Sequence, residues 1–178
     1  GPGLCRASGR RGEGRLMAAS FSVRRADYAD PADAAAIVML LDAYASDPAG
    51  GGEPLEDFAK TNLVRELAAR PQAFSILAFD GDVPVGLVNC IEGFSTFKCL
   101  PLVNVHDVAV LASHRGRGIA EQMLALAETM ARERGAVKMT LEVLSGNAPA
   151  VKLYTRIGYA GYQLDPAMGT ANFMQKWL

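Results

Sequence analysis

Residues 115–120 are the segment of this chain whose composition and spacing best suit the binding of an anion. They are Arg115, Gly116, Arg117, Gly118, Ile119 and Ala120, and they lie between an apolar strand-like run and an amphipathic helical run. Glycine at a strand-to-helix turn lets the backbone approach a ligand closely, because no Cβ intervenes. The first N–H groups of the helix have no intrahelical partner, and the helix dipole adds positive potential there. The turn therefore suits a phosphate or pyrophosphate, with both arginines as further donors.

Three kinds of phosphate-binding turn compete for this segment. A P-loop requires Lys and Ser or Thr after its second glycine, whereas Ile119 and Ala120 follow Gly118. The dinucleotide fingerprint requires a third small residue, and Glu121 stands in its place. The pattern that remains is Arg-x-x-Gly-x-Ala. It resembles the Q/R-x-x-G-x-G/A turn with which GCN5-related N-acetyltransferases bind the pyrophosphate of coenzyme A.

Residues 147–159 (NAPAVKLYTRIGY) resemble a second signature of that family, N-x-x-A-x-x-L-Y-x-x-x-G-F/Y. Each pattern alone is short enough to arise by chance, but here both occur in order, separated by one helix and one strand. The resemblance extends over about residues 103–160 and is greatest to the diamine acetyltransferase branch. It implies acetyl-CoA as co-substrate and direct transfer of the acetyl group to an amine in a ternary complex.

The resemblance also implies roles for residues outside the turn. Tyr154 matches the tyrosine that protonates the departing thiolate of coenzyme A. Asn147 is expected to contact the pantetheine or to cap its helix. The family's central strand separates from the next strand, and a backbone N–H there polarises the thioester carbonyl. By position that N–H falls between Val108 and Val110.

His106 and Asp107 are the candidate bases for the acceptor amine. A free alkylamine has a pKa of about 10.4, so it must lose a proton before it attacks. In the diamine branch a Glu-Asp pair stands here; Asp107 matches the Asp, while His106 replaces the Glu. This departure argues against a diamine substrate, but an imidazole is itself a suitable base near neutral pH. Alternatively, Asp107 bonds neighbouring backbone and His106 is an ordinary strand side chain. We expect His114 to be exposed to solvent.

The acceptor site is less well defined by the sequence. In the family the first two helices, their connection and the last strands enclose it. Here the connection and the start of the second helix carry four acids that could attract a cationic amine: Asp47, Glu53, Glu56 and Asp57. Glu92 and Phe94 are alternative lining residues. We expect a primary amine of a small molecule as acceptor. The alternatives are a protein N-terminus or a non-catalytic acyl-CoA-binding module.

Composition limits the class of protein. Half of the 178 residues are hydrophobic, yet no apolar run reaches the roughly 18 residues of a membrane span. The three cysteines, Cys5, Cys90 and Cys99, fit no zinc spacing, so we expect no metal site. Unpaired thiols are compatible with a reducing compartment, so we expect the protein in the cytoplasm. The net charge is −1; residues 1–16 hold four arginines and one glutamate, so residues 17–178 carry −4. That balance disfavours nucleic acid as a partner.

Residues 1–16 differ from the rest and are expected to be a non-native or disordered leader, so that residues 17–178 form a single domain. Periodicity and caps predict helices at 31–44, 55–69, 119–134 and 147–158. Strands are predicted at 21–26, 73–79, 83–91, 102–111, 137–144, 159–164 and 171–177, with 93–100 as a connection. This order predicts an α/β three-layer sandwich around a mixed, mostly antiparallel sheet.

Three hydrophobic residues near the C-terminus, Phe173, Met174 and Trp177, are expected in the core or on a dimer surface. Family analogy predicts a homodimer formed through the two last strands. Met123 and Met130 recur at helical spacing and are expected in the core.

Overall fold

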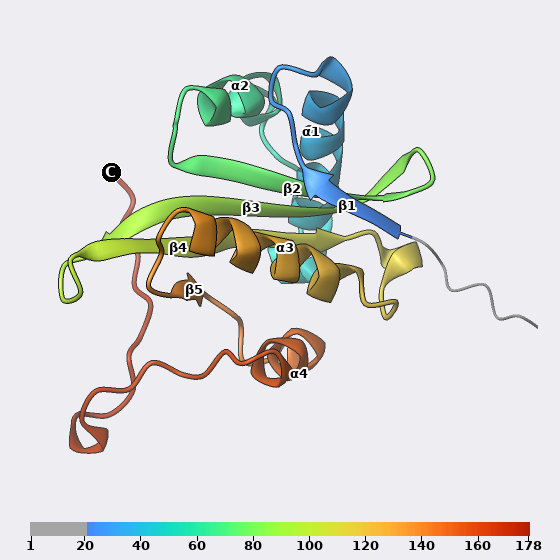
Figure 1. The fold of residues 1–178 in the computed structure, drawn as a ribbon. Coiled ribbons are helices and arrows are strands. Elements are labelled where there is room, and N and C mark those ends of the chain that lie inside the picture. Colours follow the sequence, from blue (N-terminus) through green and yellow to red (C-terminus); the bar gives the residue numbers. More distant parts are fainter. Residues whose placement is uncertain (1–20) are drawn as a thin grey trace, which may run out of the picture.

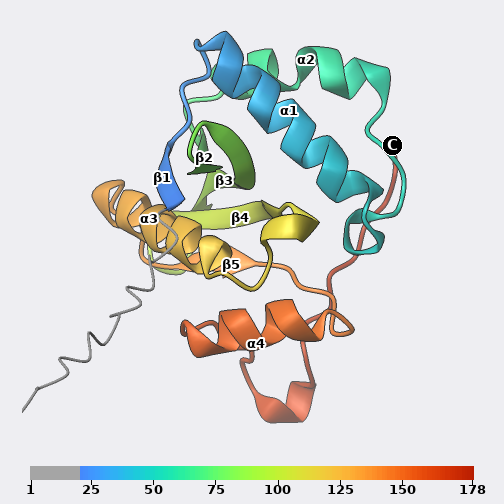
Figure 2. The ribbon, with the colours of Figure 1, turned by 90° about the vertical axis from the view of Figure 1, so that its right-hand side faces the viewer.

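The computed structural model describes residues 21–178, and the predicted leader lies outside them. The middle layer is a five-stranded sheet of order β1-β2-β3-β4-β5. Helices α1 (Pro31–Ser46) and α2 (Asp57–Ala68) lie over one face, while α3 (Ile119–Glu133) and α4 (Ala148–Arg156) lie on the opposite side (Figures 1 and 2). The predicted α/β three-layer sandwich is confirmed.

The sheet is antiparallel except at one edge. Its strands are β1 (Phe21–Arg25), β2 (Ala73–Asp80), β3 (Val83–Ser95), β4 (Leu100–Val110) and β5 (Met139–Leu141). The predicted β2–β3 hairpin forms around Gly81, whose φ of +60° favours glycine. β3 extends to Ser95 and β4 begins at Leu100, so the connection predicted at 93–100 is shorter than expected and comprises residues 96–99. β5 pairs parallel to β4 over only three residues.

A β-bulge interrupts the pairing of β3 with β4. Asn89 pairs with Asp107, but the next residue of β3, Cys90, pairs with Val105. His106 is therefore the extra residue in β4. Bulges locally bend a strand and redirect a side chain, and they are common next to active sites.

Apolar residues on the two faces of the sheet form separate cores. On one face, strand residues such as Phe74, Val88 and Val105 pack against α3, which contributes Met123 and Met130 as predicted. On the other face, Leu77, Leu87 and Ala109 pack against Ile37 and Leu40 of α1. The period-2 pattern of the strands and the period of the helices thus bury both faces.

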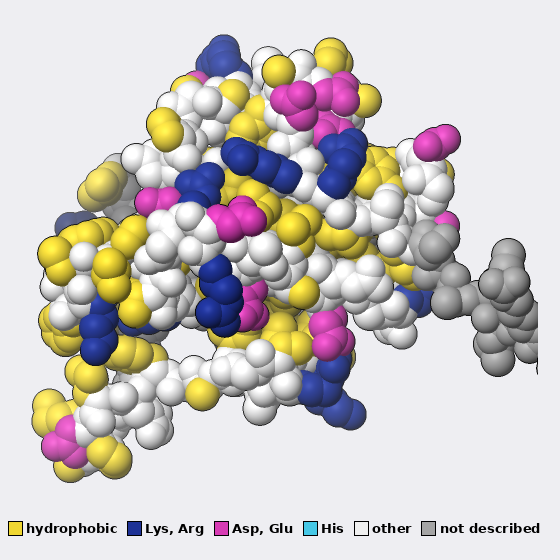
Figure 3. All heavy atoms as spheres, viewed as in Figure 1, with side chains coloured by type: hydrophobic (Ala, Val, Ile, Leu, Met, Phe, Trp, Pro, Cys, Tyr) yellow, Lys and Arg dark blue, Asp and Glu magenta, His cyan; other side chains and the backbone are white. Residues whose placement is uncertain are grey.

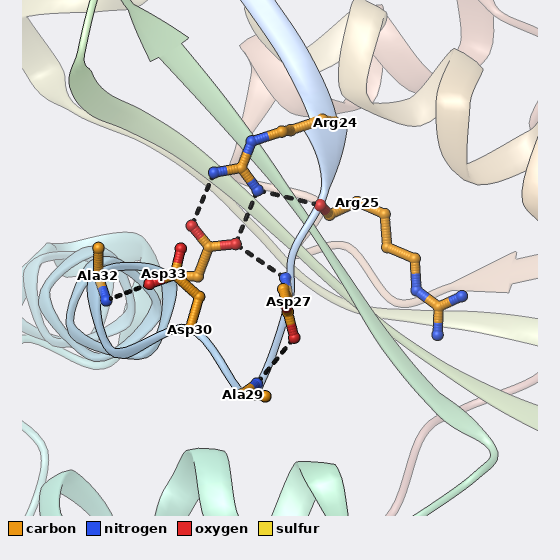
Figure 4. A network of polar contacts seen from close by, with 7 residues as sticks. All are labelled: Arg24, Arg25, Asp27, Ala29, Asp30, Ala32 and Asp33. Atoms are coloured by element: carbon orange, nitrogen blue, oxygen red, sulfur yellow. Dashed lines mark hydrogen bonds and ion pairs between the residues drawn. The ribbon is translucent and has the colours of Figure 1, made fainter.

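A polar network joins β1 to the start of α1 (Figure 4). Asp33 is only 2% exposed, and its two carboxylate oxygens accept hydrogen bonds of 2.7 and 2.8 Å from Arg24. It also accepts the backbone N–H of Asp27, at 2.8 Å. The Arg24 guanidinium is the largest cause of the lowered pKa of Asp33. Asp30 caps the helix by accepting the N–H of Ala32, as its position before Pro31 predicts.

The C-terminal part departs most from prediction. β5 is only Met139–Leu141, and beyond α4 the described chain holds a single short helix, η3 (Pro166–Met168), where two strands were predicted. Alternating residues become a strand only when a neighbour pairs with their backbone, and no pairing of this segment with β5 is formed. Phe173 and Trp177 are 78% and 87% exposed, so the expectation of a core position was wrong. Among residues 21–178, no helix is long and apolar enough to cross a membrane.

Candidate active site

A cavity of about 690 Å³ opens where β4 and β5 separate. The two strands pair only from Val103↔Met139 to Val105↔Leu141. Beyond this point one wall is formed by β4, including Val108 and Val110, and the other by residues 141–144 and α4. The separation that the family resemblance implies is therefore present. The polarising role of the backbone N–H groups between Val108 and Val110 stays a prediction.

The glycine turn forms one end of this cavity. Gly116 and Gly118 have φ of +75° and +79°, a conformation that other L residues rarely adopt. Gly118 also occupies the N-cap of α3, so the free N–H groups of the helix start beside it. Arg115, Gly116, Gly118, Ile119 and Ala120 line the cavity, whereas Arg117 does not. Left-handed glycines followed by a helix N-terminus are a donor set that fits a pyrophosphate.

Arg115 is held between two elements of the cavity wall. Its Nε donates to the carbonyl of Val110 at 3.1 Å, and its guanidinium pairs with Asp47 at 2.9 Å. Asp47 follows α1, and its carboxylate also accepts the N–H of Ala49. That backbone bond, followed by the Arg115 bond, lowers the pKa of Asp47. Asp47 therefore already forms an ion pair with Arg115.

None of the four acids proposed for the acceptor site, Asp47, Glu53, Glu56 and Asp57, lines the cavity. Glu53, Glu56 and Asp57 are exposed. Glu92 instead pairs with Arg134 at 2.9 Å, and Phe94 lies exposed towards the end of β3. The sequence placed these acids near the acceptor by family analogy, which does not specify where a side chain points.

Tyr154 projects from α4 into the cavity wall and packs edge-on against Tyr159, with ring centroids 6.0 Å apart. Burial, with a smaller contribution from Tyr44, raises the pKa of Tyr154 to about 12. The phenol thus keeps its proton at neutral pH. Tyr44 of α1 lines the same cavity and was missed by sequence reasoning, since no signature covers the end of α1.

The structure places His106 and Asp107 in different environments. His106 lines the cavity, and its Nδ1 hydrogen-bonds the amide oxygen of Asn104. Asp107 does not line the cavity; its carboxylate accepts the Asn89 amide at 2.9 Å. Asn89 in turn accepts the hydroxyl of buried Ser75 at 2.6 Å. Asp107 therefore ends a polar row across β2, β3 and β4, rather than bonding neighbouring backbone.

Two further residues of the cavity wall were predicted with different success. Asn147 lines the cavity and accepts the N–H of Ala150 at 3.4 Å, so it caps α4 as expected. His114 was expected to be exposed, but its side chain is only 18% exposed. It lies within hydrogen-bond distance of its neighbour Ser113. It also lies edge-on to Phe21 and within hydrogen-bond distance of Asp80, and these contacts with distant segments are not revealed by the local sequence.

Among residues 21–178, the buried thiol of Cys90 and the potential metal ligands do not form a reactive site or a metal site. Cys90 is buried, which raises its pKa to about 12 and keeps the thiol protonated. Within residues 21–178, no group of three or more His, Cys, Asp or Glu could hold a metal ion.

The chain belongs to the acetyltransferase (GNAT) family, whose sequence profile matches residues 37–159.

Two curated relatives match part of the chain. Over 72 residues it is 43% identical to streptothricin acetyltransferase of Streptomyces lavendulae, covering 39% of this chain and 38% of that protein. Over 110 residues it is 33% identical to an N-alpha-acetyltransferase of Sulfurisphaera tokodaii, covering 58% of this chain and 66% of that protein. The chain thus spans less than two thirds of the length of either relative.

The fold is also similar to that of a solved acetyltransferase. AAC(6')-Iy in complex with the bisubstrate analog CoA-S-monomethyl-acetylneamine has a TM-score of 0.69 and 18% sequence identity to this chain. The likeness covers 89% of this chain and 99% of that one, and it concerns the fold.

Proposed function

We propose that this protein transfers the acetyl group of acetyl-CoA to a primary amine of a small molecule. The observation that carries the proposal is the cavity between β4 and β5, which joins the glycine turn to Tyr154 and His106. The similarity to streptothricin acetyltransferase supports a small-molecule acceptor. So does the likeness to a structure that holds an analog of CoA joined to acetylneamine.

We assign each step of the acetyl transfer to residues of this chain. The amine nitrogen attacks the thioester carbonyl carbon, and the carbon–sulfur bond breaks. His106 takes the proton that the amine loses, and the Tyr154 hydroxyl gives a proton to the departing sulfur. Backbone N–H groups between Val108 and Val110 stabilise the negative charge on the carbonyl oxygen. The turn at residues 115–120 binds the pyrophosphate, and Asn147 contacts the pantetheine.

A second candidate acceptor is the N-terminus of a protein. It is favoured by the match to the N-alpha-acetyltransferase of Sulfurisphaera tokodaii. The attacking group is again a primary amine, so the same cavity chemistry applies, and only the shape of the acceptor differs.

The experiment that tests the proposal is a thiol-release assay with acetyl-CoA and two panels of acceptors. The first contains streptothricin, aminoglycosides, diamines and amino acids, and the second contains peptides with free N-termini. We expect turnover on a member of the first panel, with the acetylated amine confirmed by mass spectrometry. Turnover on peptides alone would transfer the proposal to protein N-termini. Binding of acetyl-CoA without turnover on either panel would favour a non-catalytic acyl-CoA-binding module.

We also propose that two copies of the chain associate through the C-terminal segment, residues 159–178. Exposed hydrophobic side chains concentrate in this segment: Tyr162, Leu164, Met168, Phe173, Met174 and Trp177. Figure 3 shows hydrophobic side chains gathered at the end of the molecule where the β3–β4 hairpin turns and this segment passes. Large exposed apolar patches usually mark interaction surfaces.

A further inference from the structure

We infer that Asn104 is a positioning residue, which holds His106 in the tautomer that leaves its Nε2 unprotonated. The inference rests on the proposed function, in which His106 is the base for the acceptor amine. It assigns a role to a residue that the two sequence signatures do not include.

The orientation of that amide is set by β5. The Asn104 Nδ2 lies 3.0 Å from the hydroxyl oxygen of Thr140 and 3.4 Å from the carbonyl oxygen of Thr140. A carbonyl oxygen can only accept a hydrogen bond, so the group facing it must be the amide NH₂. The amide oxygen of Asn104 therefore points to the other side, where it contacts Nδ1 of His106.

This contact decides which ring nitrogen of His106 carries the hydrogen. An amide oxygen has no hydrogen to donate, so Nδ1 must be the donor. A neutral imidazole has one N–H, which leaves the lone pair on Nε2. His106 lines the cavity, so this lone pair is available to accept a proton from an amine bound there. The arrangement corresponds to the way that a side chain behind a catalytic histidine fixes its tautomer and orientation.

The position of Asn104 in the sheet explains why it can do this. Asn104 and Thr140 are register partners in the short β4–β5 ladder, one residue before the strands separate. His106 is the bulged residue of β4, two positions further on. The bulge redirects the imidazole, while the Asn104 amide ties it to the last paired part of β5. His106 is thus oriented by a contact made beside the point where β4 and β5 separate and the cavity opens.

A long-range ¹H–¹⁵N correlation spectrum of the imidazole rings tests the inference directly. The chain has two histidines, so a His114→Gln variant assigns both sets of signals. At about pH 8 we expect the neutral His106 ring to carry its hydrogen on Nδ1. In Asn104→Leu we expect a shift towards the Nε2–H tautomer. Protonation on Nε2 in the unmodified protein, or an unchanged tautomer in Asn104→Leu, would overturn the inference.

Kinetics on the best acceptor provide the second readout. We expect Asn104→Leu to lower kcat/KM about 10- to 100-fold, less than the roughly 10²- to 10⁴-fold that a positioned base contributes, because His106 itself remains. Asn104→Asp keeps an acceptor for Nδ1 and should recover most of the loss. Thr129→Val, which removes a hydroxyl from the exposed face of α3, is the matched control and should leave kcat/KM unchanged. In a His106→Gln background, Asn104→Leu should have no further effect; an equal further loss would show a merely structural role.

The two hypotheses fail in different ways. If the protein acetylates no amine while the Nδ1–H tautomer is found and depends on Asn104, the proposed function fails and the positioning role remains. If turnover is found but Asn104→Leu leaves both tautomer and kcat/KM unchanged, the positioning role fails and the proposed function remains. The tautomer is measured without any substrate, so it does not depend on identifying the acceptor.

Discussion

At the scale of single residues, the proposed chemistry depends on a few side chains that meet in the cavity from distant parts of the chain. Tyr154 comes from α4, His106 from the bulge in β4, and Tyr44 from the end of α1. The sequence predicted the first two, because one falls within a signature and the other just before one. It could not identify Tyr44 or Asn104, whose roles depend on which strand or helix lies beside them.

Tyr154→Phe tests the proton donor. Without the hydroxyl, the departing thiolate receives no proton from the protein, and we expect kcat to fall about 100-fold while acetyl-CoA affinity is unchanged. Tyr159→Phe is the matched control, because Tyr159 packs against Tyr154 but does not line the cavity. Steady-state thiol release and calorimetric titration provide the two readouts. Equal kcat for Tyr154→Phe and the unmodified protein would remove the acid role.

Asp47→Asn tests whether the arginine of the turn is restrained before the co-substrate binds. The ion pair of Asp47 with Arg115 competes with any phosphate that Arg115 would contact. A surface ion pair in water is only weakly stabilising, so we expect acetyl-CoA affinity to rise by no more than about fivefold. Glu66→Gln, which removes a surface pair with Arg70 in and just after α2, is the control. Weaker binding in Asp47→Asn would instead mean that Asp47 holds Arg115 in its binding position.

At the scale of elements, local signals predicted well wherever an element is defined by its own residues. The caps at Asp30 and Asn147 and the hairpin at Gly81 all form where the sequence placed them. The predictions failed for 137–144 and for the two C-terminal strands, because a strand also requires a partner. The alternation of residues shows which face is apolar, but it does not show whether a neighbouring backbone is present.

Acid should weaken the packing of α1 on β1 through Asp33. The pKa of Asp33 is lowered in the folded state, so its contribution is present above the ordinary Asp pKa of about 3.9 and is lost as the pH falls through the folded value. We expect the free energy of unfolding to decrease as the pH falls from about 5 to about 2. Asp33→Asn should destabilise the protein by about 2 kcal/mol at neutral pH and flatten this dependence.

Urea denaturation across this pH range measures the effect. Asp82→Asn is the matched control, since Asp82 lies exposed in the hairpin after Gly81. We expect it to leave both the stability and its pH dependence unchanged. An unchanged acid dependence in Asp33→Asn would show that other carboxylates are responsible.

At the scale of the whole molecule, we propose that a second copy of the chain covers the C-terminal segment, residues 159–178. If two copies associate through it, light scattering of the full chain should give the mass of a dimer. Trp177→Ser combined with Phe173→Ser should shift the equilibrium towards the monomer, because both side chains are largely exposed in one copy. Phe58→Ser is the control, since Phe58 is equally exposed but lies on α2. A monomeric unmodified protein would contradict the proposal.

We propose that the cavity binds acetyl-CoA through the turn at residues 115–120. Calorimetric titration of acetyl-CoA into the full chain measures this binding. We expect a dissociation constant on the order of 1 µM, weakened at least tenfold in Gly118→Ala, because alanine strains the left-handed backbone of the turn. Gly81→Ala carries the same strain in the β2–β3 hairpin and should leave affinity unchanged. An absence of binding, or an equal loss of affinity in both variants, would show that this turn does not bind the co-substrate.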